Sequence, residues 1–169
     1  MATDARDVLE ILELLEREGV DLWIEGGWGI DALVGVQHRD HGDLDVVVDA
    51  DDADRVRAAL GGAGWRVIFE DPPGRASYQD ARGRIVDVSV TVADRYGDRW
   101  SANRTLGRGE PDYAFDGFTY GWIGGQKVPC IGPETQVAHH LGYEIEDVDT
   151  FDMKLLRDRF DVALPESLR

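Results

Sequence analysis

The chain has 169 residues, of which 43% are hydrophobic and 31% are charged, a composition typical of a folded globular protein rather than a disordered segment. Its 34 acidic and 18 basic residues give a formal net charge of −16, and such a surface repels phosphate backbones, which disfavours broad binding of DNA or RNA. The single cysteine, Cys130, excludes a disulfide framework, no apolar run is long enough to span a membrane, and we expect a cytoplasmic protein with a buried, inert thiol.

The first half of the chain predicts alternating helices and strands. Apolar residues at three- and four-residue steps predict a helix over residues 4–18, and the apolar run 22–24 predicts a strand. Residues 25–29 contain three glycines, which weaken both helix and strand, so we expect no regular element there. The elements expected after them are a helix that restarts at Ile30, a strand over 41–49, a helix over 51–60 and a strand over 65–69.

The second half predicts more strands and then helices. Alternating apolar residues predict a strand over 84–92, whereas residues 94–116 have the composition of a loop. The remaining expected elements are a turn at 72–74, a hairpin of 118–123 with 127–131, a helix from Pro133 to about Tyr143, and a last helix capped by Thr150 that ends near 162. We therefore expect one α/β (α+β) domain over 1–169, with a mixed β-sheet flanked by helices and a helical C-terminal segment over about 133–169.

Two carboxylates stand close together in the strand predicted over 41–49. Side chains alternate along a strand, so Asp43 and Asp45 are expected to point to one side and Leu44 to the other. Two adjacent carboxylates repel each other and call for a cation, and magnesium prefers carboxylate and phosphate oxygens. An Asp-x-Asp pair is also common, however, and it can simply cap the turn that follows.

A third carboxylate lies in the strand predicted over 84–92. Alternating valines form one apolar face of this strand, which leaves Asp87 on the opposite face. If the two strands are neighbours, Asp87 joins Asp43 and Asp45, and three carboxylates can hold two metal ions for in-line displacement at phosphorus. Asp87 is then the natural general base, on the acceptor side of the second metal ion.

The glycines at positions 26, 27 and 29 lie between a predicted strand and a predicted helix. Glycines at such a point let backbone N–H groups cradle phosphate oxygens, although they can also form only a tight turn. The stretch matches neither the P-loop pattern nor the Gly-x-Gly-x-x-Gly dinucleotide pattern. Together with the three carboxylates, it favours a phosphate-handling site.

These motifs carry a family resemblance. Gly26-Gly27-Trp28, Asp43-Leu44-Asp45 and then Asp87 resemble the nucleotidyltransferase superfamily that includes DNA polymerase β. More narrowly, GGWGIDALVGVQHRDHGDLDVVVD is similar to the small antibiotic nucleotidyltransferases, namely the lincosamide nucleotidyltransferases and the aminoglycoside 2″-nucleotidyltransferases. The C-terminal run HHLGYEIEDVDTFDMKLL is similar to the tail of the lincosamide enzymes. The resemblance implies a nucleotidyltransferase fold, with ATP or another nucleoside triphosphate as co-substrate.

The resemblance also implies roles for single residues. Asp43, Asp45 and Asp87 would bind two Mg²⁺ ions, and Asp87 would also act as the base. Among the aromatic residues we expect Tyr143, in the C-terminal matching segment, to line the acceptor pocket, although core packing is the ordinary role of such residues. The residues expected around the nucleotide are Gly26, Gly27, Arg39, His41 and Lys154.

Three of these assignments have ordinary structural alternatives. The guanidinium of Arg39 suits a phosphate, but it can instead form a salt bridge to one of the nearby aspartates. His41 can contact the nucleotide or make a structural hydrogen bond. Lys154 can reach the triphosphate or be a solvated lysine on a helix.

We therefore expect a magnesium-dependent enzyme that transfers AMP to a hydroxyl of a small-molecule antibiotic and releases pyrophosphate. The C-terminal run favours a lincosamide acceptor, whereas the acidic surface suits a polycationic aminoglycoside. The alternatives are a nucleotidyltransferase that modifies a protein or tRNA, as in toxin–antitoxin systems, and a non-catalytic nucleotide-binding module. Neither a nucleic-acid partner nor a membrane partner is expected, and a homodimer is an expectation from the resemblance.

Overall fold

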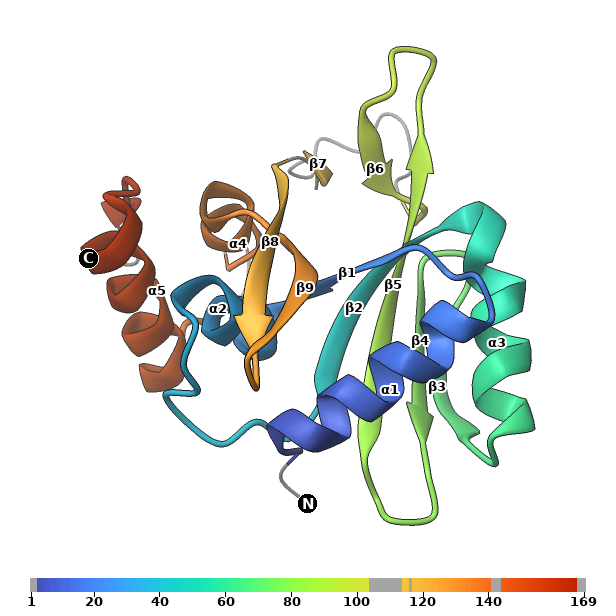
Figure 1. Cartoon of the computed structure of the whole chain (residues 1–169). Helices are drawn as coiled ribbons and strands as arrows, with labels where there is room; N and C mark the ends of the chain where they lie inside the picture. Colours follow the sequence, from blue (N-terminus) through green and yellow to red (C-terminus); the bar gives the residue numbers. More distant parts are fainter. Residues whose placement is uncertain (1–2, 104–113, 116, 141–143, 167–169) are drawn as a thin grey trace.

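The computed structural model describes residues 3–103, 114–115, 117–140 and 144–166, and within them a mixed β-sheet is flanked by helices (Figure 1). The strands are β1 (Leu22–Glu25), β2 (Leu44–Asp49), β3 (Arg66–Asp71), β4 (Arg75–Gln79), β5 (Ile85–Ala93), β6 (Arg99–Ser101), β7 (Ala114–Phe115), β8 (Phe118–Ile123) and β9 (Gln126–Ile131). Their order is β3-β4-β5-β2-β1-β9-β8, with β6 paired to β5 and to β7. β1 is antiparallel to β2, whereas β2 is parallel to β5 and β1 to β9. The α/β (α+β) fold class expected from the sequence is confirmed.

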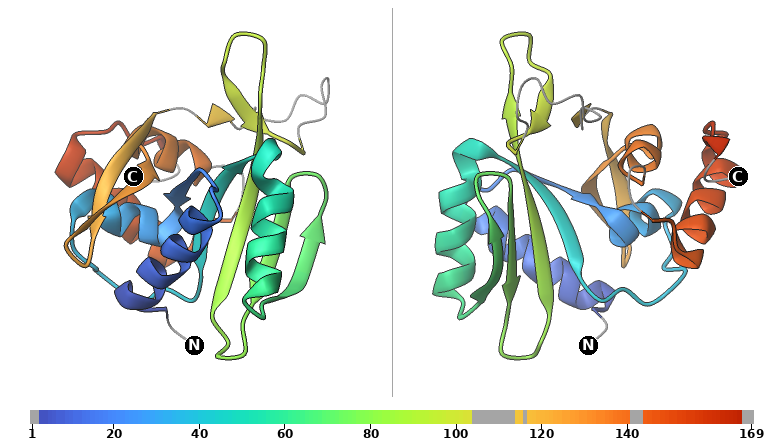
Figure 2. Two further views of the ribbon diagram at one scale, coloured as in Figure 1. Left: turned by 45° about the vertical axis from the view of Figure 1, so that its right-hand side comes forward. Right: turned by 180° about the vertical axis from the view of Figure 1, so that it is seen from behind.

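The helices form two groups at opposite sides of the molecule. They are α1 (Ala5–Arg17), α2 (Gly26–Val34), α3 (Ala53–Gly62), α4 (Pro133–His139) and α5 (Asp147–Phe160), together with the short 3-10 helix η1 (Ala50–Asp52). The views in Figures 1 and 2 place α1 and α3 beside β2 to β5, and α2, α4 and α5 at the end that carries β8 and β9. None of the described helices is long and apolar enough to cross a membrane.

Two hydrophobic clusters hold these groups together. The larger cluster packs the apolar sides of α1 and α3 against alternate residues of the central strands, such as Val46 and Val88. The smaller cluster joins Ile30 of α2 to residues of α4 and α5, among them Met153. Trp28 of α2 belongs to the larger cluster, so α2 is apolar on two sides because it packs into both.

The glycine stretch is the main departure from the sequence prediction, because α2 begins at Gly26 and contains all three glycines. Local propensity argues against a helix there, since glycine costs about 1 kcal/mol relative to alanine inside a helix. Close packing requires glycine nevertheless, because a Cβ atom on Gly29 would lie 2.3 Å from Nε2 of Gln136 in α4. Tertiary contacts therefore override the weak helix propensity of these residues.

Three strand predictions also need correction. β4 occupies residues 75–79, where no element is expected, because Arg-Ala-Ser-Tyr-Gln lacks the β-branched run typical of a strand. β2 begins at Leu44 and not at His41, because the residues just before it form a bend. β6 and β7 lie within the 94–116 segment that was expected to be a loop.

The two C-terminal helices have different ends from those predicted. α4 ends at His139 instead of near Tyr143. α5 begins at Asp147 rather than at Thr150, because Glu146 is its N-cap and forms a capping box with the third helical residue. The hydroxyl of Thr150 instead donates to the carbonyl of Glu146 one turn back.

Candidate active site

Three acidic residues stand in register on three neighbouring strands. Glu25 at the end of β1 pairs with Asp45 of β2, and Asp45 pairs with Asp87 of β5. Residues paired in this way point to the same face of a sheet, and neighbouring strands are about 4.8 Å apart. All three are half-buried, whereas the residues beside them in each strand face the main core. The two strands that carry the predicted carboxylates are therefore neighbours.

Asp43 joins this acidic row from just outside the strand. It precedes Leu44, the first residue of β2, so the alternation predicted to align Asp43 with Asp45 does not extend to it. Burial raises the pKa of the Asp43 carboxyl, and the charge of Asp87 raises it further. Burial also raises the pKa of Asp45 well above its usual value, with added contributions from Glu25, Asp43 and Asp87. The charges of Glu25, Asp43 and Asp87 thus all act on Asp45.

The row offers the oxygen ligands that a hard divalent cation prefers. The Oδ1 atom of Asp87 is buried and has no hydrogen-bond partner, which is costly unless a cation satisfies it. Among the described residues, no three His, Cys, Asp or Glu side chains converge tightly enough to hold a metal ion as they stand. The donor set therefore fits magnesium by its chemistry, and the side chains would have to draw together around the ion.

Gly26 and Gly27 bring the start of α2 close to the acidic row. A Cβ atom on Gly26 would lie 2.3 Å from Oδ2 of Asp45, and Gly26 has a φ of +62°. A Cβ atom on Gly27 would lie 2.3 Å from Nδ1 of His41 and 2.7 Å from Nη2 of Arg39. The first N–H groups of a helix have no partner within it and attract anions. At α2 such groups lie between the carboxylates and a guanidinium.

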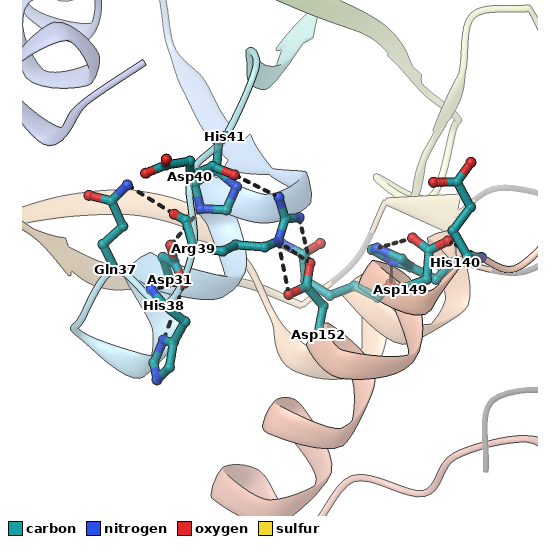
Figure 3. A network of polar contacts seen from close by, with 11 residues as sticks. Asp31, Gln37, His38, Arg39, Asp40, His41, His140, Asp149 and Asp152 are labelled. Carbon is teal, nitrogen blue, oxygen red and sulfur yellow. Dashed lines mark hydrogen bonds and ion pairs between the residues drawn. The ribbon is translucent and has the colours of Figure 1, made fainter. Parts of the chain in front are cut away.

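Arg39 is held by an ion pair with α5 (Figure 3). Its Nη2 atom lies 2.6 Å from Oδ2 of Asp152, and its Nε atom lies 3.2 Å from both carboxylate oxygens. Asp152 is buried, so the pair fixes the guanidinium where it packs on Gly27. The salt bridge considered as the alternative role for Arg39 is thus present. It also leaves Arg39 at the start of α2, and contact with a nucleotide stays a prediction.

His41 makes the structural hydrogen bond that was its alternative role. Its Nε2 atom lies 2.5 Å from Oδ2 of Asp31 in α2, and both side chains are buried (Figure 3). The other oxygen of Asp31 lies 3.3 Å from Nδ1 of His38. Asp31 therefore fastens the segment that precedes β2 to helix α2. Because His41 is only 3% exposed, its placement supports the structural role better than a nucleotide contact.

The remaining predictions concern Lys154, Tyr143 and Cys130. Lys154 is exposed on α5, and at about 100° per residue its side chain is turned by about 200° from Asp152. This orientation gives no support to a contact with a triphosphate beside Arg39. Tyr143 lies outside the described residues. Cys130 is buried, and burial raises the pKa of its thiol to about 12, in agreement with the inert thiol expected.

Two residues at the acidic row, Glu25 and His139, are not among those predicted from the sequence. The Nδ1 atom of His139 in α4 lies 3.3 Å from Oε2 of Glu25. Glu25 had a usable signal, because it is the last residue of a strand and directly precedes the glycines. His139 had none, since 114 residues separate it from its partner and only the fold brings the two together.

Comparison with known proteins identifies relatives along most of the chain. A family model described as aminoglycoside-2″-adenylyltransferase matches residues 7–156. A lincosamide resistance protein of Staphylococcus haemolyticus is 31% identical over 154 residues, which cover 90% of this chain and 93% of that protein. Both matches include the acidic row and the glycine stretch, because they extend over nearly the whole sequence.

Solved structures share the fold. A lincosamide antibiotic adenylyltransferase, LnuA, in its lincomycin-bound form matches with a TM-score of 0.81 and 30% identity, over 93% of this chain and 98% of LnuA. ANT(2″)-Ia in complex with adenylyl-2″-tobramycin matches with a TM-score of 0.71 and 19% identity, over 91% of this chain and 87% of that enzyme. At that identity the second match shows the fold alone. The nucleotidyltransferase fold expected from the sequence is confirmed.

Proposed function

Because the chain belongs to the aminoglycoside-2″-adenylyltransferase family, we propose that this nucleotidyltransferase moves AMP from ATP to a hydroxyl group of a lincosamide antibiotic. In this reaction the acceptor oxygen bonds to the α-phosphorus, the bond from that phosphorus to pyrophosphate breaks, and the acceptor proton passes to a base. The observation that carries the proposal is the in-register pairing of Asp45 with Asp87. It brings two carboxyl groups side by side on adjacent strands, which supports their use as a metal ligand and a base in this reaction.

The acidic row supplies the groups that the reaction needs at phosphorus. Asp43, Asp45 and Asp87 are the residues that would hold two magnesium ions, and the buried, unpaired Oδ1 of Asp87 supports this assignment. When bound, the ions supply positive charge to the triphosphate and to the acceptor oxygen. Asp87, which pairs with Asp45 from β5, is the carboxylate that accepts the proton of the acceptor hydroxyl in this proposal.

The start of α2 binds and orients the triphosphate. The N–H groups that follow Glu25 donate to phosphate oxygens, and the absence of side chains at Gly26 and Gly27 lets the phosphates approach the backbone. Arg39 pairs with the phosphates by its guanidinium while Asp152 fixes its direction. The close packing of Arg39 on Gly27 supports this position for the triphosphate.

The choice of a lincosamide rests on similarity. The lincomycin-bound LnuA is 30% identical and matches this chain over 98% of its own length, whereas ANT(2″)-Ia is 19% identical and is matched over 87%. The net charge of −16 and the description of the family model favour an aminoglycoside instead. The more complete and more similar match supports lincosamide as the first acceptor to test.

The test uses the purified full chain with ATP, magnesium and one of two acceptors, lincomycin or tobramycin. We expect pyrophosphate release with lincomycin, together with a drug product that is heavier by one adenylyl group in the mass spectrum. Turnover with tobramycin alone would keep the nucleotidyl transfer and overturn the choice of acceptor. Binding of ATP without turnover of either drug would show that the acceptor is a different molecule.

A further inference from the structure

Glu25 occupies a position in the acidic row that the proposed reaction does not use. It is the last residue of β1 and stands in register with Asp45, which lies between it and Asp87. The charge of Glu25 contributes more to the raised pKa of Asp45 than does the charge of Asp43 or of Asp87. Asp45 therefore has a register-paired carboxyl group on each side, Glu25 on β1 and Asp87 on β5.

The side chain of Glu25 does not cap helix α2, which is the structural role that its position offers. Glu25 is the N-cap residue of α2, a position where a side-chain oxygen usually accepts from the first N–H groups of the helix. Serine, threonine, aspartate and asparagine are preferred there, and glutamate is not. The side chain of Glu25 makes no such capping bond. Helix formation thus gives no reason for a glutamate at this point.

Glu25 is instead held from the far side by α4. The Nδ1 atom of His139 lies 3.3 Å from Oε2 of Glu25, and both side chains are largely buried, with 12% and 13% exposed. A second residue that fixes the direction of a carboxylate is common around metal ions, where a supporting hydrogen bond keeps the ligand aimed. The contact also joins α4 to the strand that precedes the glycines.

We propose that Glu25 is a fourth carboxylate of the metal site and that His139 is its positioning residue. Glu25 contributes to the ion that Asp45 also binds, on the side of Asp45 opposite Asp87. This inference rests on the proposed function, because it takes the metal ions of that reaction as its premise. It gives a function to a glutamate that stands in register with Asp45 and does not cap helix α2.

Binding of Mn²⁺ to the full chain without nucleotide or drug tests the proposal apart from turnover. Free Mn²⁺ is measured by electron paramagnetic resonance during a titration of each variant. We expect Glu25→Gln to weaken Mn²⁺ binding by about tenfold, because a charged oxygen ligand becomes a neutral amide. We expect His139→Ala to weaken it by up to about tenfold, and His139→Asn, which keeps an N–H donor near the place of Nδ1, to recover most of the loss.

A matched control separates ligation from bulk charge. Glu16→Gln makes the same change of charge on the exposed side of α1, and it should leave Mn²⁺ binding unchanged. A second measurement, the melting temperature without metal, should stay close to that of the wild type in Glu25→Gln, because the amide keeps the size of the side chain. A weakened affinity together with an unchanged melting temperature excludes a simple loss of folding.

Two results would overturn the inference, and they differ from a failure of the proposed function. If Glu25→Gln binds Mn²⁺ as the wild type does while Asp45→Asn loses binding, the metal site stands and Glu25 is not part of it. If Glu25→Gln keeps Mn²⁺ affinity and instead raises the KM for the drug, Glu25 contacts the acceptor. If the wild type binds no Mn²⁺ even with ATP present, the metal-dependent function itself fails.

Discussion

The two sides of the candidate site are built in different ways. On the sheet side, Asp45 and Asp87 are placed by the backbone register of β2 and β5, with six consecutive residue pairs between the strands. On the helical side, Arg39 is placed by Asp152 of α5, and Glu25 is steadied by His139 of α4. Each of these two contacts joins residues more than 110 positions apart in the chain.

The difference shows which part of the site tolerates change. A register of backbone hydrogen bonds survives the replacement of a side chain, so a carboxylate of the row can be removed without moving its neighbours. An ion pair between two side chains is lost when either partner is replaced, because the contact needs both charged groups. Substitutions on the sheet side should therefore change chemistry with little loss of order, whereas those on the helical side should loosen substrate binding.

The largest effect is expected for Asp87→Asn. The amide cannot accept the acceptor proton and binds magnesium poorly, so turnover should fall by about 100- to 10,000-fold with an unchanged fold. Steady-state kinetics and a melting curve of the same preparation check both parts. Ser89→Ala, on the same face of β5 two residues further on, is the matched control and should keep most of the activity. Wild-type turnover in Asp87→Asn would remove Asp87 from the proposed role of base.

Gly27→Ala should have the next largest effect. Its Cβ atom would lie 2.3 Å from Nδ1 of His41 and 2.7 Å from Nη2 of Arg39, so Arg39 or the start of α2 must move. We expect the KM for ATP to rise by about tenfold, which corresponds to about 1.4 kcal/mol. Gly42→Ala, where a Cβ atom meets nothing within 4 Å, should bind ATP normally. Equal KM values in the two variants would contradict the placement of the phosphates at α2.

Asp152→Asn should have a smaller effect, on the helical side of the site. The amide keeps the size of the side chain but loses the charge that holds Arg39, so the KM for ATP should rise several-fold while kcat changes less. Isothermal titration with ATP and magnesium measures the binding step directly. Asp158→Asn, on the exposed side of the same helix, should change neither value. A fall in kcat alone would mean that Asp152 acts on the chemical step and not through Arg39.

The smallest effect is expected for the stability of the metal-free protein. The pKa of Asp45 is raised in the folded state, so the folded chain holds its proton at pH values where the unfolded chain has lost it. The stability contributed by this group is therefore present at low pH and is lost as the pH rises from the unfolded pKa towards the folded one. Asp45→Asn should raise the free energy of unfolding at pH 7 and flatten its pH dependence. Urea denaturation with a chelator measures the free energy of unfolding at pH 5 and at pH 7. A loss of stability in Asp45→Asn would show that other groups of the protein already stabilise the Asp45 carboxylate without metal.

The sheet side could be predicted from the sequence, and the helical side could not. Alternating valines around Asp87 gave the face of its carboxylate, because a strand has a fixed period of two. The helix at the glycines escaped prediction, because its local propensity is poor and packing against Asp45, His41 and Gln136 decides the conformation. The identity of the partner of Arg39 was equally hidden, since a chain with 34 acidic residues offers many candidates.

The long sequence separation of the contacts from α4 and α5 has a consequence for the order of assembly during synthesis. The strands that carry Glu25, Asp45 and Asp87 can pair once the ribosome has released about ninety residues. The rate of synthesis limits how soon this happens. Arg39 must wait for Asp152, which emerges more than sixty residues later. A nascent chain would therefore contain the acidic row before the ion pair between Arg39 and Asp152 can form beside it. Competence to bind the nucleotide would arrive last, with the final helix.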